Sequence, residues 1–192
     1  LLCGPHHRIR NFRIEGRGRH RPVLLSAQLL QIHQVLGDVL GHDDAHVSDV
    51  ADGWNPTFAI ASALAEPELE VAAPDGGRVS TRGGQVLVFG GDEVYPYPSK
   101  EAYATRTEAP YSAAFEGAGR HPNVFAVPGN HDWYDSLVAF SRSFCRPERG
   151  FAGCTTQQTR SYFALKLPHD WWLLAMDLQL GADLDEPQVR YF

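Results

Sequence analysis

The sequence predicts an α/β protein in which a parallel sheet is covered by helices and followed by an antiparallel hairpin. Through the middle of the 192-residue chain, short apolar segments alternate with helical segments, and this alternation is typical of parallel sheets. Near the end of the chain, two further apolar runs flank a turn, as in a hairpin. With 43% hydrophobic and 21% charged residues, the chain has enough apolar side chains for one globular core.

The first 46 residues are expected to precede the main domain, which we place at 47–192. Residues 1–21 are predicted to form a basic, irregular segment, and they lack the long apolar core of a secretory signal. Residues 22–46 are predicted to form an amphipathic helix, from about Val23 to Gly41, and a linker. The apolar positions of this helix recur at helical spacing: Leu25, Leu29, Ile32, Leu36 and Leu40. Polar residues interrupt the segment, whereas a membrane-spanning helix needs about 20 mostly apolar residues.

The main domain is expected to start with a short strand and a helix over 56–69. Asn55 is the expected cap of this helix, with a proline at its first position. The composition of residues 73–84 indicates a surface loop. The second strand, 85–89, is almost wholly apolar and rich in β-branched residues. This composition is typical of a strand covered on both faces.

The same pattern then repeats. A helix is predicted from Ser99 to about Ala118, with the Ser99 side chain as its cap. Residues 123–140 again contain a buried strand, a glycine turn and a helix. The hairpin is predicted within 160–180, turning at 168–170, and a further helix opens at 185–188. Because the chain ends there, we expect it to be a fragment of something longer.

Polar side chains follow each of the three predicted parallel strands. Asp49 and Asp52 follow the first strand, Asp92 the second, and Asn130 to Asp132 the third. In open α/β sheets, ligands bind beyond the carboxyl ends of the strands. Carboxylate and amide oxygens suit hard metal ions, and imidazole suits zinc and iron. The sequence therefore predicts a metal site at this edge of the sheet.

Two of these stretches resemble signature blocks of a known family. "GGDEVY" (90–95) and "GNHD" (129–132), each closing a strand, resemble the second and third blocks of the calcineurin-like metallophosphoesterases. "GDEVY" is similar to the GDxxY form of the purple acid phosphatase branch. The wider resemblance, to uncharacterised bacterial members, covers about 47–192. It implies a metallophosphoesterase-type αββα sandwich, of which this chain holds the N-terminal half with its parallel sheet.

The resemblance also implies a role for each of these residues. Asp49 would be a ligand of the first metal ion, Asp92 would bridge two metal ions, and Asn130 would be a ligand of the second. His131 would contact phosphate oxygen or protonate the leaving group, and Asp132 would orient its ring. Imidazole suits this task because it is the side chain that changes charge nearest to neutral pH. The implied cofactors are two divalent or mixed-valence ions (Mn, Fe or Zn).

The chain departs from the family pattern at the first block. Ala51 stands where that block has histidine or glycine, so Asp52 or Tyr95 is a candidate for the missing ligand. Tyr95 has two interpretations, an iron-binding phenolate or a ring that packs under Pro96 and Pro98.

The later histidine blocks of the family are absent. His169 is the only histidine after Asp132, and its place in the hairpin turn makes it a poor candidate ligand. We therefore predict that this chain alone binds two metal ions poorly.

The expected reaction is hydrolysis of a phosphate mono- or diester by a hydroxide that two metal ions activate. The substrate would be a small phosphate ester or a phosphoprotein. The alternative is a regulatory or interaction domain that keeps the fold with an incomplete metal centre. A Rossmann-like nucleotide binder is disfavoured, because neither GxGxxG nor GxxxxGK[ST] follows a strand.

The composition also bears on nucleic-acid binding, on the state of the cysteines and on cellular location. The net charge of -6 argues against binding nucleic acid through a broad basic surface. Three cysteines without a CxxC pair are expected to be reduced, and we expect a cytoplasmic protein. The sequence leaves membrane association and oligomeric state open. Trp171 and Trp172 are expected to lie in the core.

Overall fold

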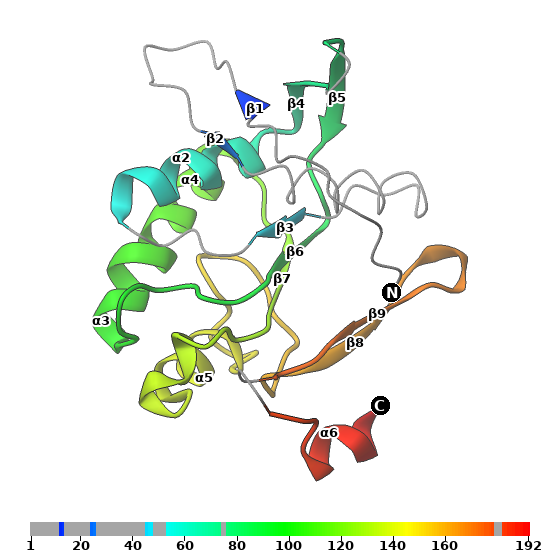
Figure 1. The fold of residues 1–192 in the computed structure, drawn as a ribbon. Coiled ribbons are helices and arrows are strands. Elements are labelled where there is room, and N and C mark those ends of the chain that lie inside the picture. Colours follow the sequence, from blue (N-terminus) through cyan, green and yellow to red (C-terminus); the bar gives the residue numbers. More distant parts are fainter. Residues whose placement is uncertain (1–11, 14–23, 26–44, 48–52, 74–75, 179–181) are drawn as a thin grey trace.

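A three-stranded parallel sheet lies at the centre of the fold (Figure 1). Its strands are β3 (Ala45–Val47), β6 (Val86–Phe89) and β7 (Asn123–Ala126), in the order β3-β6-β7. The last residues of all three strands pair with one another across the sheet, so the strands end at one common edge. The computed structural model describes residues 12–13, 24–25, 45–47, 53–73, 76–178 and 182–192.

Helices cover one face of this sheet (Figure 1). They are α2 (Trp54–Ala65), α3 (Lys100–Ala102), the π-helical turn η1 (Tyr103–Glu108), α4 (Ala109–Ala118) and α5 (Val138–Phe144). The mixed α/β class that the sequence predicts is therefore confirmed.

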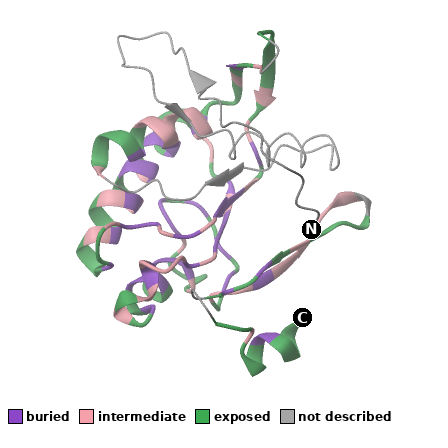
Figure 2. Ribbon diagram, viewed as in Figure 1, coloured by how far each residue is buried: buried purple, intermediate pink, exposed green. Residues whose placement is uncertain are grey.

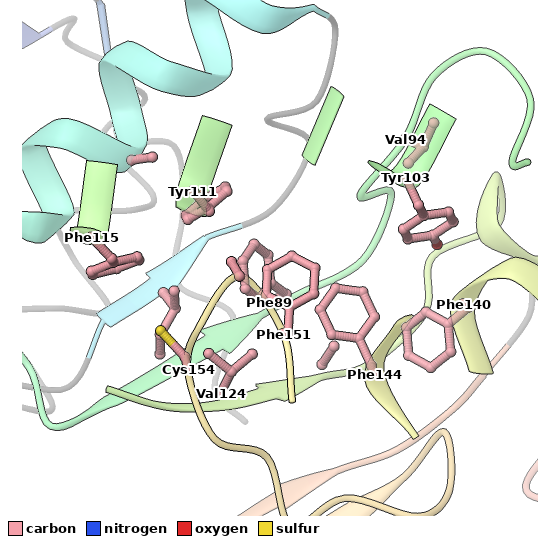
Figure 3. Packing of buried hydrophobic residues seen from close by; sticks show 14 of the residues in the cluster. Phe89, Val94, Tyr103, Tyr111, Phe115, Val124, Phe140, Phe144, Phe151 and Cys154 are labelled. Atoms are coloured by element: carbon pink, nitrogen blue, oxygen red, sulfur yellow. The ribbon is translucent and has the colours of Figure 1, made fainter. Parts of the chain in front are cut away.

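The core on the helical face is built around Phe89, at the end of β6 (Figure 3). Its ring lies 4.9 Å from that of Tyr111, and 5.4 Å from those of Phe144 and Phe151. All four side chains are buried. Aromatic contacts at these centroid distances add to the burial of apolar area, so the strand end that leads into the candidate site is firmly packed.

The predicted antiparallel hairpin is present, and it covers the other face of the sheet. Its strands β8 (Phe163–Lys166) and β9 (Trp172–Ala175) are joined by the 3-10 turn η3 (Pro168–Asp170). Val88 and Phe125 of the sheet pack against this hairpin. Because neighbouring residues of β6 and β7 face opposite cores, both strands are covered on both sides, as their apolar composition indicates.

The long helix predicted from Ser99 is present but contains a π-helical turn. The Ser99 hydroxyl accepts a hydrogen bond from the Ala102 amide at 3.0 Å and caps the helix. Pro110 has no N–H to donate to the carbonyl four residues earlier, and its ring would crowd that carbonyl. The wider π turn lies directly before this proline and accommodates it. The helix ends at Gly119, which has a left-handed φ of 63°.

Two predictions near α2 are wrong. The helix begins at Trp54 with Gly53 as its cap, in place of Asn55, and it ends at Ala65. The predicted loop over 73–84 contains strand β5 (Arg78–Arg82), which pairs with β4 (Glu68–Ala72). Most residues of these two strands are exposed, and within them Val71 of β4 is the buried one.

The tryptophan pair of the hairpin is exposed, which corrects its expected place in the core. Trp171 and Trp172 are 54% and 56% exposed. Figure 2 shows much of the hairpin in the colours of intermediate and exposed residues. Trp172 alternates with core-facing residues of β9, so its side chain lies on the outer face of the hairpin.

The N-terminal part is described at two short strands, β1 (Phe12–Arg13) and β2 (Leu24–Leu25), which pair antiparallel. Residues 24–25 are thus a strand where a helix was predicted, and the rest of that helix lies outside the described residues. At the C-terminal end, α6 (Glu186–Tyr191) is capped by Asp185, whose carboxylate accepts from the Gln188 amide at 3.0 Å. None of the helices within the described ranges has the length and apolar character to cross a membrane.

Candidate active site

The turns that follow β6 and β7 pack directly against each other. Gly91 has a φ of 112°, and a Cβ on this residue would lie 2.8 Å from the Gly129 nitrogen. A Cβ on Gly129 would lie 2.5 Å from the Asp92 nitrogen. Real Cβ atoms do not approach backbone this closely, so the contact requires glycine on both sides.

A buried carboxylate joins the two turns. Asp132 begins the 3-10 helix η2 (Asp132–Asp135) and is fully buried. Its Oδ2 accepts hydrogen bonds from the Asp92 and Gly129 amides, both at 2.8 Å. Its Oδ1 accepts a hydrogen bond from the Tyr103 hydroxyl on the π-helical turn. One side chain therefore holds both turns and ties them to the helical layer.

Asp92 is held in a strained conformation at the edge of the sheet. Its φ of 54° lies in the left-handed region, which residues other than glycine rarely adopt. Its Oδ1 accepts from the His131 amide and its Oδ2 from the Tyr95 hydroxyl, both at 2.9 Å. Each oxygen keeps lone-pair capacity for a further partner. The hydroxyl of Tyr95 thus faces the Asp92 carboxylate, and the Tyr95 ring lies 4.4 Å from that of His131.

The ring of His131 is oriented by a backbone carbonyl. Its Nδ1 lies 2.9 Å from the Pro96 oxygen. Because a carbonyl only accepts hydrogen bonds, Nδ1 carries a proton and Nε2 is the nitrogen left for another partner. The role expected for Asp132, orienting this ring, is wrong, because its carboxylate is directed to the two turns.

The remaining predicted ligands are only partly described. Asn130 is half-buried, and its amide nitrogen donates to the Tyr134 hydroxyl at 3.4 Å. Asp49 and Asp52 lie outside the described residues. Within the described ranges, no three His, Cys, Asp or Glu side chains are grouped closely enough to hold a metal ion. Asp92 and Asn130 carry oxygen atoms of the kind that hard metal ions prefer as ligands.

Sequence reasoning missed two residues that support the site. Glu93 is buried beneath the first turn, and its Oε1 accepts from the Gly91 amide at 2.8 Å. Burial, and then the nearby Asp132 carboxylate, raise the pKa of Glu93 well above its usual range. Tyr103 lies in the middle of a helix, where no local signal marks it. Glu93 is part of the "GGDEVY" stretch, but the sequence does not show that its side chain is buried.

The second turn is also connected to the hairpin. The indole nitrogen of Trp133 donates to the Asp177 carboxylate at 2.8 Å, and Asp177 follows β9. The amide of Asp177 donates to the Gln188 side chain on α6 at 2.9 Å. The candidate site is therefore supported from the helical layer and from the hairpin.

Comparison of the chain with protein-family models, with curated proteins and with solved structures finds no match.

Proposed function

We propose that this chain is the metal-binding half of a metallophosphoesterase-type αββα sandwich and hydrolyses a phosphate mono- or diester. The observation that carries the proposal is the interlocking of the two glycine turns through Asp132. It brings Asp92 and the Asn130–His131 pair, from separate strands, to one edge of the sheet. A surface loop gains little from such an arrangement, whereas a catalytic site needs fixed positions for its groups.

The residues proposed to bind two metal ions come from the turns after β6 and β7 and from the segment after β3. Asp92 and Asn130 supply oxygen atoms from the two interlocked turns. Asp49 and Asp52 follow β3 in the sequence and would supply further carboxylates, with Tyr95 as the alternative to Asp52. Two ions of Mn, Fe or Zn, when bound, would lower the pKa of a water molecule and neutralise phosphate charge.

His131 is proposed to act on the leaving group. The Pro96 carbonyl keeps the proton of Nδ1, so that Nε2 is the atom that takes up and delivers the second proton. The imidazolium form would then donate from Nε2 to the ester oxygen as the bond to phosphorus breaks. Asp92 accepts from the His131 amide and so fixes the distance between this ring and the carboxylate.

Hydrolysis of 4-nitrophenyl phosphate and bis(4-nitrophenyl) phosphate with Mn(II) tests this proposal. We expect His131→Ala to lower kcat by about 100-fold or more, and Asp92→Asn to lower bound manganese as well as activity. His121→Ala and Asp183→Asn, which alter exposed residues, are the matched controls. Equal activity in the site and control variants would refute the assignment.

A second candidate is a non-catalytic interaction or regulatory domain with an incomplete metal centre. It is favoured by the lack of a group of three His, Cys, Asp or Glu side chains within the described part of the chain. This candidate predicts a folded protein that cleaves neither ester, even with manganese in large excess. Stoichiometric manganese together with turnover of either ester would exclude it.

A further inference from the structure

A row of four rings extends from the candidate site to the surface. In order, these rings belong to Tyr95, His131, Tyr134 and Tyr97, and we call them the aromatic row. Their successive centroids are 4.4, 4.8 and 6.4 Å apart. The two turns each contribute two of the rings, so the row exists because the turns are interlocked.

The outer two rings of the row are exposed but held in place. Tyr97 is 56% and Tyr134 51% exposed. The Tyr97 hydroxyl donates to the Tyr134 carbonyl at 3.3 Å, and the Asn130 amide donates to the Tyr134 hydroxyl at 3.4 Å. Pro96 and Pro98 flank Tyr97 and restrict its backbone. Exposed tyrosine rings that are already ordered can bind a ligand at low entropic cost.

We infer that the aromatic row is a subsite for a planar aromatic group on the leaving side of the phosphate ester. The inference rests on the proposed function, in which the ester oxygen lies beside His131. From there, the exposed rings of Tyr134 and Tyr97 are the next surface in the row. Aryl groups and nucleobases share the required chemistry, a flat ring that stacks on tyrosine.

The spacing of the outer rings indicates how such a group binds. A ring inserted between two others needs a separation of about 7 Å, twice the contact distance of carbon atoms. The 6.4 Å between Tyr97 and Tyr134 is shorter than this. The ligand ring therefore does not fit between the two tyrosines and stacks on one of them from outside the pair.

Calorimetric titration of the chain in Mn(II) with phenylphosphonate, cyclohexylphosphonate and inorganic phosphate tests the inference without turnover. Simple apolar burial favours the larger cyclohexyl group, whereas stacking favours phenyl. We expect phenylphosphonate to bind about tenfold tighter than cyclohexylphosphonate. Tyr134→Ala and Tyr97→Ala should remove the preference, and Tyr134→Phe should keep it. Trp171→Ala, another exposed aromatic, is the matched control and should keep it.

The three probes and the tyrosine variants together distinguish failure of this inference from failure of the proposed function. Phosphate binding without a phenyl preference, or a preference that survives both alanine variants, would overturn the aromatic subsite and leave the hydrolase proposal standing. A phenyl preference that depends on the tyrosines, without phosphate binding, would support the subsite and count against the phosphate site. Binding of none of the three probes would overturn both.

Discussion

The sheet edge and the β4–β5 hairpin each contain a carboxylate that joins chain segments, but the two carboxylates lie in opposite environments. At the sheet edge, Asp132 is fully buried and accepts three hydrogen bonds from three separate segments. In the hairpin, Glu70 meets Arg78 across the strands at 3.1 Å, with both side chains 64% exposed. The two contacts use the same functional group within one chain.

The Glu70–Arg78 ion pair and the Asp132 hydrogen bonds differ in whether water can replace the contact when it is lost. Water can solvate the exposed pair as soon as it separates, and salt screens its attraction. Asp132 is buried, so water does not readily take its place. Loss of the carboxylate therefore leaves the amides of Asp92 and Gly129 without a hydrogen-bond acceptor. Burial therefore makes one carboxylate essential to a site and the other nearly neutral.

Replacing the buried carboxylate should have the largest effect. We expect Asp132→Ala to lower the free energy of unfolding by about 3–5 kcal/mol, because three donors lose their acceptor. Urea denaturation followed by far-UV circular dichroism measures this.

Asp135, at the other end of η2, is the matched control for this substitution. Its carboxylate accepts from the Val138 and Ala139 amides at 3.0 and 2.9 Å, and it is half-buried. Asp135→Ala should cost about 1 kcal/mol, as for other helix caps. Equal losses in the two variants would show that burial is not what distinguishes Asp132.

The glycine contact provides the second way to disturb the sheet edge. Gly91→Ala should lower the free energy of unfolding by about 1–3 kcal/mol, because the new Cβ meets Gly129 and the φ is positive. Gly117→Ala in α4, where nothing lies within 4 Å of the added Cβ, should be neutral or stabilising by up to about 1 kcal/mol. Urea midpoints of both variants measure the contrast, and a neutral Gly91→Ala would argue against interlocked turns.

The central strand β6, the Ser99 cap and the hairpin turn could be predicted because their signals are local. The apolar run at 85–89, the Ser99 cap and the turn at 168–170 each depend on neighbouring residues, and the structure has all three. The β4–β5 hairpin was missed, although Leu69 and Val71 alternate with glutamates and the Pro-Asp-Gly-Gly run between the strands is a turn signal.

The sequence indicated some residues of the candidate site but not its geometry. The sequence places Asp92 and His131 after two strands of one sheet, and their direct contact agrees with this. It contains no sign that Asp132 would accept from an amide 40 positions earlier, or from Tyr103. Such partners are set by tertiary packing, and the adjacency of Asp132 to His131 suggested a different role.

The pH dependence of stability provides a third test, at a carboxyl buried beside Asp132. The pKa of Glu93 is raised in the folded state, so above its ordinary value of 4.5 the unfolded chain releases a proton that the folded chain keeps. This group therefore lowers stability as pH rises, by at most about 1.4 kcal/mol per pH unit, until the folded pKa is reached.

Glu93→Gln should remove this slope, because the amide keeps an acceptor for the Gly91 amide and does not ionise. Urea denaturation between pH 5 and 8 compares the variant with the unaltered chain. Glu116→Gln on the exposed side of α4 is the control and should leave the slope unchanged. Parallel pH profiles for Glu93→Gln and the unaltered chain would mean that the carboxyl is not buried as described.

The smallest effect is expected at the exposed pair of the hairpin. Arg78→Ala should lower the free energy of unfolding by less than about 1 kcal/mol at physiological salt, and less again at high salt, because both groups remain solvated. Urea denaturation at low and high salt measures this difference. A loss close to that of Asp132→Ala would mean that the pair is shielded from water in solution. The energetic contrast between the two carboxylates would then disappear.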